Sequence, residues 1–109
     1  YHLSNLVAIV DYNKLQSYGP ISAVMPLEPL AEKWRAFGFG VCEVDGHDVA
    51  ALRSSFASLP FEADKPNVLI AHTVKGKGIS FAENDPDWHH KATIDAEMGA
   101  RMRAALEAA

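Results

Sequence analysis

The sequence has 109 residues, which gives room for one domain with a modest hydrophobic core. Hydrophobic residues make up 49% and charged residues 22%, and the net charge of −4 comes without a basic stripe, so the composition argues against nucleic acid as a partner. The longest apolar runs fall far short of the roughly 20 residues that a membrane span needs, so no membrane association is expected.

The first predicted element is a strand at residues 5–10, which contain a continuous apolar run of the kind found in strands buried on both faces. Polar side chains follow it, and two prolines and a glycine in residues 17–26 predict a surface loop. Ligands of open parallel sheets bind beyond the C-terminal ends of the strands, where Asp11 and Asn13 offer the oxygen donors that Mg²⁺ accepts. The competing interpretation is structural, because Asp and Asn after a strand commonly bond their own backbone in a turn.

A helix is predicted next, with Pro29 in its first turn and Gly38 ending it in a left-handed conformation. Its apolar residues recur at helical spacing and are interpreted as core: Leu27, Leu30, Trp34 and Phe37. Residues 40–44 form the second predicted strand. The one cysteine, Cys42, lies in this strand and cannot form an internal disulfide. We interpret it as a packing residue in a reducing compartment, and therefore expect a cytoplasmic location.

The turn at residues 45–48 (Asp-Gly-His-Asp) leads into a second predicted helix, and His47 is interpreted as a residue at the start of that helix. Four apolar residues make the buried stripe of this helix: Val49, Leu52, Phe56 and Leu59. Pro60 closes the helix. A fully apolar strand follows, beginning at Val68 and continuing to residue 74.

A terminal helix is predicted over residues 95–108, with Thr93 as its N-cap. The order of strands and helices predicts an α/β fold, in which helices pack on the faces of a parallel sheet. Three strands make only a partial sheet. An uncovered edge strand carrying Ile9 or Ile70 would promote aggregation, so we expect the chain to need more sequence or a partner.

Residues 76–91 lack periodicity and predict an ordered loop, which in a compact domain is usually functional. At its start, residues 75–78 read Lys-Gly-Lys-Gly, where glycines let backbone amides approach an anion and lysines add positive charge. The spacing matches neither a Walker P-loop nor a dinucleotide-binding fingerprint. A flexible turn with solvated lysines is the alternative interpretation.

The same loop carries Trp88-His89-His90. Imidazole donates hydrogen bonds to phosphate and exchanges protons with hydroxyl groups near neutral pH, so these histidines are candidate site residues. Zinc is the competing ligand, but adjacent histidines without a nearby cysteine or a spaced histidine make a poor zinc site.

Six segments follow one another along the chain: 11–16 (Asp-Tyr-Asn-Lys-Leu-Gln), 25–30 (Met-Pro-Leu-Glu-Pro-Leu), 33–38 (Lys-Trp-Arg-Ala-Phe-Gly), 44–48 (Val-Asp-Gly-His-Asp), 73–81 (Thr-Val-Lys-Gly-Lys-Gly-Ile-Ser-Phe) and 88–91 (Trp-His-His-Lys). Together they resemble transketolase, specifically its thiamin diphosphate-binding region. The resemblance runs from about Asn5 to Lys91. It is closest to the bacterial and archaeal type, in which the N-terminal half is a separate subunit.

The resemblance implies a three-layer fold of helix, parallel sheet and helix, with residues 1–109 as the C-terminal portion of a thiamin diphosphate-binding domain. It implies a transferase that moves a two-carbon ketol unit between ketose and aldose phosphates in the pentose phosphate pathway. Thiamin diphosphate and Mg²⁺, or another divalent cation, are the implied cofactors. By the same resemblance Asn13 and Leu15 ligate the metal, Leu15 through its main-chain carbonyl, and Asn13 also touches the cofactor diphosphate. His89 is the implied catalytic residue and contacts both diphosphate and sugar substrate, whereas His90 receives no role.

The chain departs from the family pattern in several ways. The third protein ligand to the metal, an aspartate in a Gly-Asp-Gly motif, is not in this sequence. Tyr12 stands where the family usually has Asp or Asn, and Tyr18-Gly19 replaces a frequent Asp-Gly. The glutamate that activates the cofactor belongs to a pyrimidine-binding domain or subunit that is also missing. We therefore expect an active site formed between two chains, in a homodimer or heterotetramer, and no activity from this polypeptide alone.

Two other interpretations stay open. One is a piece of another thiamin diphosphate enzyme, such as 1-deoxyxylulose-5-phosphate synthase or a dehydrogenase E1 subunit, although residues 33–38 and 44–48 favour transketolase. The other is a truncated, non-catalytic remnant or an interaction module that pairs through its exposed sheet edge. Under the favoured interpretation, the expected partners are sugar phosphates and the rest of the transketolase.

Overall fold

The computed structural model describes residues 1–91 and 93–108, so the predicted domain limit at residue 109 lies outside the described residues. The chain divides into two compact units. The first, called the sheet unit here, comprises Tyr1–Asn13 and Pro26–Thr73. The second, called the hairpin unit, comprises Lys14–Met25 and Val74–Ala109. None of the helices that the described residues form combines the length and the apolar character needed to cross a bilayer.

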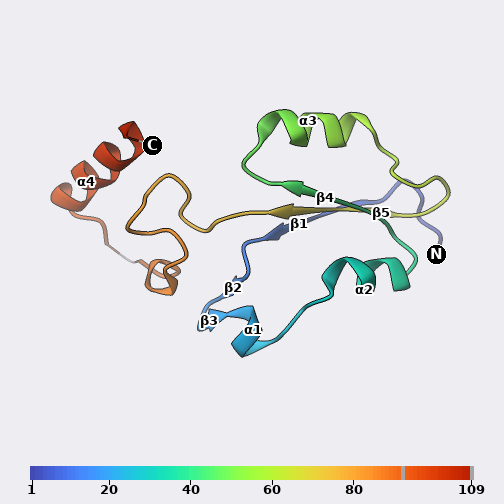
Figure 1. Ribbon diagram of the computed structural model, residues 1–109, viewed down its shortest axis with the longest axis horizontal. Helices are drawn as coiled ribbons and strands as arrows, with labels where there is room; N and C mark the ends of the chain where they lie inside the picture. Colours follow the sequence, from blue (N-terminus) through green and yellow to red (C-terminus); the bar gives the residue numbers. More distant parts are fainter. Residues whose placement is uncertain (92, 109) are drawn as a thin grey trace. The chain divides into compact units, whose positions relative to one another are not determined.

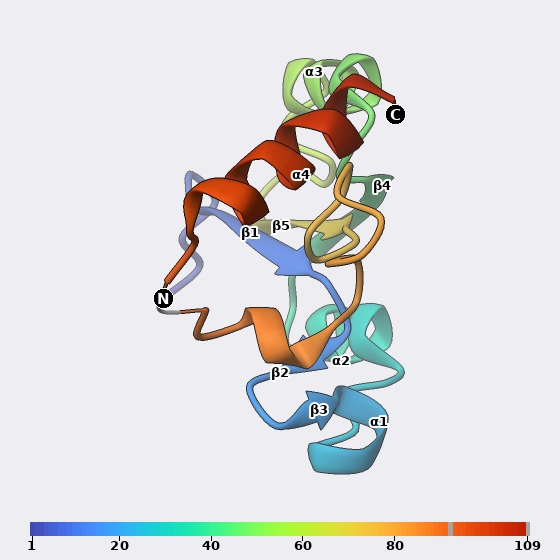
Figure 2. The ribbon, with the colours of Figure 1, turned by 90° about the vertical axis from the view of Figure 1, so that its left-hand side faces the viewer.

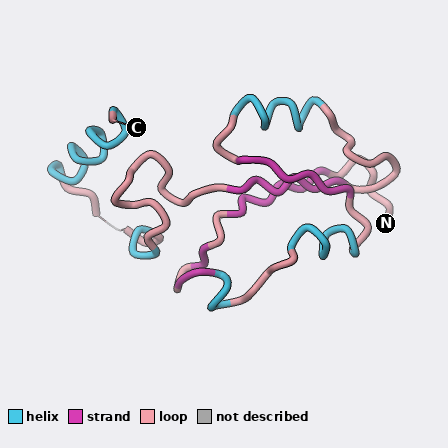
Figure 3. Tube along the Cα trace, in the orientation of Figure 1, coloured by secondary structure: helices cyan, strands magenta, loops and turns pink. Residues whose placement is uncertain are grey.

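The sheet unit is a parallel sheet between two helices. Strands β1 (Val7–Tyr12), β5 (Asn67–His72) and β4 (Gly40–Asp45) pair in the order β1-β5-β4, and both pairings are parallel (Figure 1). Figure 3 shows the strands in magenta. Helices α2 (Leu30–Ala36) and α3 (Val49–Ala57) lie on opposite faces of this sheet (Figures 1 and 2). The predicted three-layer α/β architecture is confirmed.

The core of this unit is the central strand β5. Every residue from Asn67 to Ala71 is buried, and Leu69 is 0% exposed, because the strand has a neighbour on each side and a helix over each face. Asn67 is the buried polar residue at its start. Its amide oxygen accepts from the Glu62 backbone N–H at 3.0 Å and its amide nitrogen donates to the Lys65 carbonyl at 2.8 Å, so the preceding connection is tied to the strand.

Strand β1 is not buried on both faces, contrary to the sequence prediction. Ile9 is 60% exposed and Val7 is also exposed, whereas Ala8 and Val10 on the other face are half-buried. The reason is the strand order: β1 is an edge strand, while α2 and α3 both pack against β4. The uncovered strand edge expected at Ile9 is therefore present, and Ile70 lies in the central strand instead.

Helix α2 begins directly after Pro29. Gly38, just beyond the end of the helix, has a φ of +85°, the left-handed conformation that the sequence predicts. Phe37 was expected in the core but is 82% exposed. The helix ends at Ala36, so Phe37 no longer follows the helical stripe. Phe39 takes its place and packs edge-on against Trp34, with ring centroids 4.8 Å apart.

Helix α3 begins where the sequence predicts, and its N-cap is Asp48, whose side chain accepts from the Ala51 backbone N–H at 2.9 Å. The predicted stripe is only partly core, because Val49 and Phe56 are exposed. Cys42 of β4 is half-buried, with its Sγ 3.9 Å from the Ser55 Oγ of α3, as expected of a packing residue.

The hairpin unit has regular structure where a loop was predicted at residues 17–26. Strands β2 (Leu15–Gln16) and β3 (Gly19–Pro20), of two residues each, pair as a hairpin. Helix α1 (Ile21–Val24) follows as a single helical turn. Such short elements are set by a few hydrogen bonds rather than by a hydrophobic pattern, so periodicity does not reveal them.

The remainder of the hairpin unit is the predicted loop and terminal helix. The loop contains one 3₁₀ turn, η1 (Pro86–Trp88), and the helix α4 spans Ala96–Glu107. The predicted N-cap Thr93 is wrong. Asp95 caps α4, because its carboxylate accepts from the Met98 backbone N–H at 2.7 Å.

Candidate functional site

The C-terminal edge of the sheet gathers the last residues of all three strands. Tyr12 of β1 pairs in register with His72 of β5, and His72 pairs with Asp45 of β4. Asn13 is the first residue beyond β1. It therefore stands at the edge where open parallel sheets bind ligands, as the sequence predicts for this residue.

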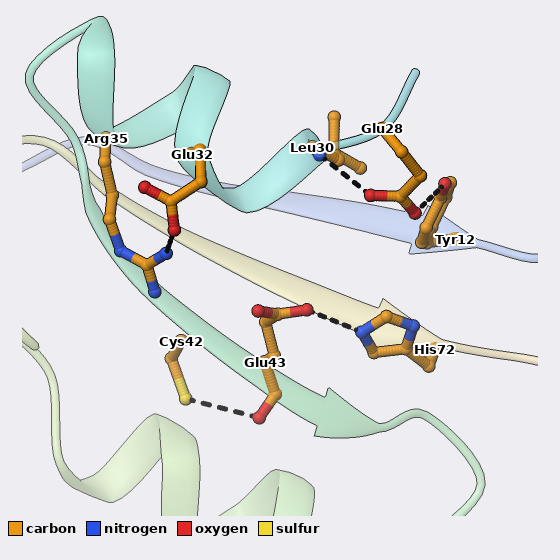
Figure 4. A network of polar contacts seen from close by, with 8 residues as sticks. All are labelled: Tyr12, Glu28, Leu30, Glu32, Arg35, Cys42, Glu43 and His72. Carbon is orange, nitrogen blue, oxygen red and sulfur yellow. Dashed lines mark hydrogen bonds and ion pairs between the residues drawn. The ribbon is translucent and has the colours of Figure 1, made fainter. Parts of the chain in front are cut away.

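Tyr12 is the buried group at this edge. Its side chain is 4% exposed, and its hydroxyl donates to Glu28 Oε1 at 2.6 Å (Figure 4). Burial, followed by the hydrogen bond and the negative charge of Glu28, raises the pKa of Tyr12 to about 12, so the phenol stays protonated at neutral pH. The second oxygen of Glu28 accepts from the Leu30 backbone N–H at 2.9 Å, at the first residue of α2. One carboxylate thus joins the end of β1 to the start of a helix.

His72 extends this cluster across the sheet. Its ring packs edge-on against Tyr12, with centroids 5.6 Å apart, and its Nε2 lies 2.8 Å from Glu43 Oε2 (Figure 4). Neither His72 nor Glu43 receives a role from the sequence. Side chains along a strand alternate between the two faces of the sheet, and this is the signal that could have found them. Once the register is known, Tyr12, His72 and Glu43 fall on the same face.

A second contact holds the end of β1 from the other face. Asp11 Oδ1 accepts a short hydrogen bond from the Thr73 hydroxyl. The backbone N–H of Thr73 donates to the Tyr12 carbonyl at 3.2 Å. The last two residues of β1 are therefore bonded through both their side chains and the main chain.

The turn after β4 has a structural explanation. A Cβ at Gly46 would lie 2.5 Å from the Thr73 methyl, so only glycine allows this approach to the chain beyond β5. The Gly46 N–H donates to the His72 carbonyl at 2.8 Å, and the Asp45 carboxylate accepts from the His47 N–H at 2.8 Å. His47 lies in the turn just before the Asp48 cap, as predicted for a residue at the start of the helix.

In the hairpin unit, the position of Leu15 is set by the register of the short ladder between β2 and β3. Leu15 pairs with Pro20, which has no N–H, and the hydrogen-bonded position next to it joins the Ile21 N–H to the Lys14 carbonyl at 3.0 Å. Positions in an antiparallel ladder alternate, so Leu15 occupies a non-hydrogen-bonded position of this short ladder.

The donor chemistry of Asn13 and Leu15 fits magnesium. An amide oxygen and a main-chain carbonyl are hard oxygen donors, and Mg²⁺ commonly takes few protein ligands and completes its shell with water and phosphate oxygens. Zinc would instead use cysteine or histidine. Within residues 1–91 and 93–108, no group of three or more His, Cys, Asp or Glu side chains is placed to hold a metal ion.

His89 lies in the hairpin unit, directly after η1, and contacts two other segments of the chain. Its Nε2 is 3.0 Å from Ser17 Oγ in the β2–β3 turn, and its Nδ1 is 3.4 Å from Lys75 Nζ. His90 packs edge-on against it, with ring centroids 4.4 Å apart. Ser17 and Lys75 were given no individual role from the sequence, because only the folded loop brings them to the imidazole.

Residues 75–78 form an ordered turn in which the two lysines differ. Gly76 and Gly78 have φ values of +75° and +91°, and the Asn84 N–H donates to the Lys75 carbonyl at 2.9 Å. Lys77 pairs with Glu83 at 3.7 Å, whereas Lys75 faces His89. The positive charge available to an anion beside His89 is therefore that of Lys75.

Asn13 belongs to the sheet unit, and Leu15 and His89 belong to the hairpin unit. The expectation that Asn13 and His89 contact one diphosphate stays a prediction.

Comparison with known proteins gives a consistent result. The family model described as "Transketolase, thiamine diphosphate binding domain" matches residues 1–108. The chain is 44% identical over 90 residues to an apulose-4-phosphate transketolase subunit of Phocaeicola vulgatus, covering 83% of this chain and 32% of that protein. It is 39% identical over 105 residues to the 6-deoxy-6-sulfo-D-fructose transketolase subunit SqwG of a Clostridium species, covering 96% of this chain and 38% of that protein. The chain thus spans about a third of the length of these relatives.

The fold is similar to that of transketolase from Campylobacter jejuni, with a TM-score of 0.72 at 21% identity. The similarity covers 97% of this chain and 20% of that structure.

Proposed function

Since this chain belongs to the transketolase family, as its thiamin diphosphate-binding domain, we propose that it acts within a larger enzyme that transfers a two-carbon ketol unit from a ketose phosphate to an aldose phosphate. Residues 1–109 form the C-terminal portion of the diphosphate-binding domain in this proposal. The enzyme is a cytoplasmic transferase of the pentose phosphate pathway.

The observation that carries the proposal is the position of Asn13. It follows β1 directly, at the C-terminal edge of a parallel sheet, and Leu15, two residues later in the sequence, adds a main-chain carbonyl oxygen. This is the edge at which such sheets bind ligands, and the two oxygens suit a divalent cation that bridges to a diphosphate.

The site residues have different tasks. Asn13 and Leu15 supply oxygen ligands to Mg²⁺, or to another divalent cation, and Asn13 also contacts the diphosphate. His89 donates a hydrogen bond to phosphate and exchanges a proton with a hydroxyl of the sugar. Lys75, 3.4 Å from His89, adds the positive charge that an anionic group needs there. Thiamin diphosphate, when bound, supplies the electron sink for cleavage of the bond beside the ketone.

The proposed partner is a second polypeptide or domain that carries the pyrimidine-binding half of the site. Two of the relatives are named as transketolase subunits, which supports an enzyme divided between chains. We therefore expect a homodimer or heterotetramer, with sugar phosphates as substrates.

Cofactor binding tests the proposal first. Titration of the protein with thiamin diphosphate in the presence of Mg²⁺, followed by calorimetry, should give saturable binding that chelation of the metal abolishes. Asn13→Ala should weaken this metal-dependent binding because it removes an oxygen ligand. Asn5→Ala, the same change at an exposed position before β1, should bind normally. Equal binding by both variants would contradict the metal role of Asn13.

Turnover is the second test. This polypeptide alone, with thiamin diphosphate, Mg²⁺, xylulose 5-phosphate and ribose 5-phosphate, should show no activity. Addition of the rest of the transketolase from the same source, with the third metal ligand and the pyrimidine-binding domain, should give turnover. Activity from the polypeptide alone would refute the divided site.

A further inference from the structure

The residue that precedes Asn13 is anchored through its side chain. Tyr12 is 4% exposed and bonded through its hydroxyl to Glu28 at 2.6 Å, within the range of a charge-assisted O–H···O⁻ bond. Glu28 in turn bonds the Leu30 N–H at the start of α2. Through Glu28, the side chain of Tyr12 is therefore fixed relative to the start of helix α2.

The main chain passes this restraint on to Asn13. The Thr73 N–H bonds the Tyr12 carbonyl at 3.2 Å. That carbonyl shares one planar peptide with the nitrogen and Cα of Asn13, so its orientation sets where Asn13 begins. The side chain of Tyr12 fixes one end of this peptide and Thr73 fixes its plane. Asn13 is thus the first residue beyond a strand end held on two sides.

We propose that Tyr12 and Glu28 are positioning residues for the divalent metal: their hydrogen bond holds the end of β1 so that Asn13 presents its amide oxygen in the geometry that the ion requires. The inference rests on the proposed function, because it takes Asn13 as a metal ligand. Mg²⁺ demands near-octahedral geometry, so a small displacement of one ligand lowers affinity. Residues that orient metal ligands typically contribute about 10- to 100-fold in affinity.

The identity of Tyr12 supports this role over a general packing role. Its hydroxyl, at the end of a long side chain, reaches the Glu28 carboxylate at 2.6 Å. The ring of Tyr12 also packs edge-on against His72, a contact that phenylalanine would keep. The hydroxyl makes the bond to Glu28, and its removal in phenylalanine breaks that bond.

The test is the dissociation constant of Mg²⁺ at saturating thiamin diphosphate, measured by calorimetry on the intact protein. Tyr12→Phe should weaken Mg²⁺ binding about tenfold. Tyr1→Phe, the same change at a fully exposed tyrosine, should leave it unchanged. Glu28→Ala should weaken binding as Tyr12→Phe does, and the double variant should be no weaker than either single one, because both remove the same link. Glu32→Gln, an exposed glutamate of α2, is the control for Glu28.

Thermal unfolding without metal separates positioning from stability. A purely structural role would lower the Tm of the metal-free variants and leave the Tm increase on adding Mg²⁺ and cofactor unchanged. Positioning predicts that the increase itself shrinks. Glu28→Gln, which keeps an acceptor oxygen, should recover part of the affinity that Glu28→Ala loses.

The outcomes distinguish failure of the positioning role from failure of the proposed function. If Asn13→Ala loses Mg²⁺ while Tyr12→Phe binds within twofold of the unmodified protein, the positioning role is overturned and the proposed function stands. If the unmodified protein binds no Mg²⁺ with thiamin diphosphate, the proposed function fails and the positioning role fails with it.

Discussion

The sheet unit and the hairpin unit are stabilised by different interactions. The sheet unit has a central strand, β5, in which residues 67–71 are all buried between neighbouring strands and helices. In the hairpin unit, only Gly19 and Ala82 are buried among the residues that the structure describes, and neither η1 nor α4 contains a buried residue. Hydrogen bonds and ring contacts hold its loops instead, such as those of His89 and the packing of Phe81 against Trp88.

This difference bears on the candidate site. Asn13 follows a strand of the unit that is built on apolar burial, while Leu15 and His89 lie in the unit held by polar contacts. Segments with few buried apolar contacts open at lower free energy than packed strands. We therefore expect the metal-side anchor at Asn13 to be well ordered before ligands bind, and His89 to gain order from the anion that it contacts.

The largest expected effect tests the burial of β5 against the exposure of β1. Leu69→Ala should lower the free energy of unfolding by about 3 kcal/mol, because it opens a cavity in a fully enclosed site. Ile9→Ala, at the exposed face of the edge strand, should lower it by less than about 1 kcal/mol. Chemical denaturation of both variants measures the difference. Equal losses would mean that β1 is covered in the protein in solution.

A smaller effect concerns the polar contact inside the otherwise apolar sheet unit. Burial and Glu28 raise the pKa of Tyr12 from 10.0 to about 12, so between these values the unfolded chain releases the phenol proton while the folded chain keeps it. The free energy of unfolding should therefore fall as pH rises through this window, by at most about 3 kcal/mol, and be unaffected by Tyr12 below pH 10. Tyr12→Phe should lack this component in urea titrations at several pH values. Parallel pH profiles for the two proteins would refute the shift.

The smallest effect compares one helix cap in each unit. Asp48 caps α3 and Asp95 caps α4 through the same kind of hydrogen bond, so replacement of either by alanine should cost about 1 kcal/mol. Hydrogen exchange should show that the two substitutions lower the protection of different parts of the chain. Asp48→Ala should reduce the protection of α3 and of the sheet, whereas Asp95→Ala should reduce that of α4 alone. Loss of protection in β5 from Asp95→Ala would show that the two units unfold together.

Much of the fold could be predicted because its signals are local. The apolar run of β5, and the helical spacing and starting proline of α2, each reflect neighbours within a few residues, and both elements formed where expected. Errors occur where position depends on distant partners. Thr93 and Asp95 are both N-cap residue types, and the place where α4 begins decides between them.

The candidate site divides in the same way. Asn13, Leu15 and His89 could be named from ordered motifs because chemistry at a site constrains residue type and spacing. Glu28, His72, Ser17 and Lys75 could not, because each acquires its partner from a segment remote in the chain. No periodicity or spacing encodes such pairings before the register is known.

The sequence by itself determined the family, the α/β class, the three main strands and the residues proposed to bind metal and phosphate. These follow from residue type and short-range pattern, which need no knowledge of what lies opposite. Only the tertiary structure decided that β5 is central and β1 is an edge, that Phe37 is exposed, and that Tyr12 bonds Glu28 beside Asn13. The physical reason is that burial and hydrogen bonding are properties of surroundings, and the surroundings of a residue are set by chain segments far from it in sequence.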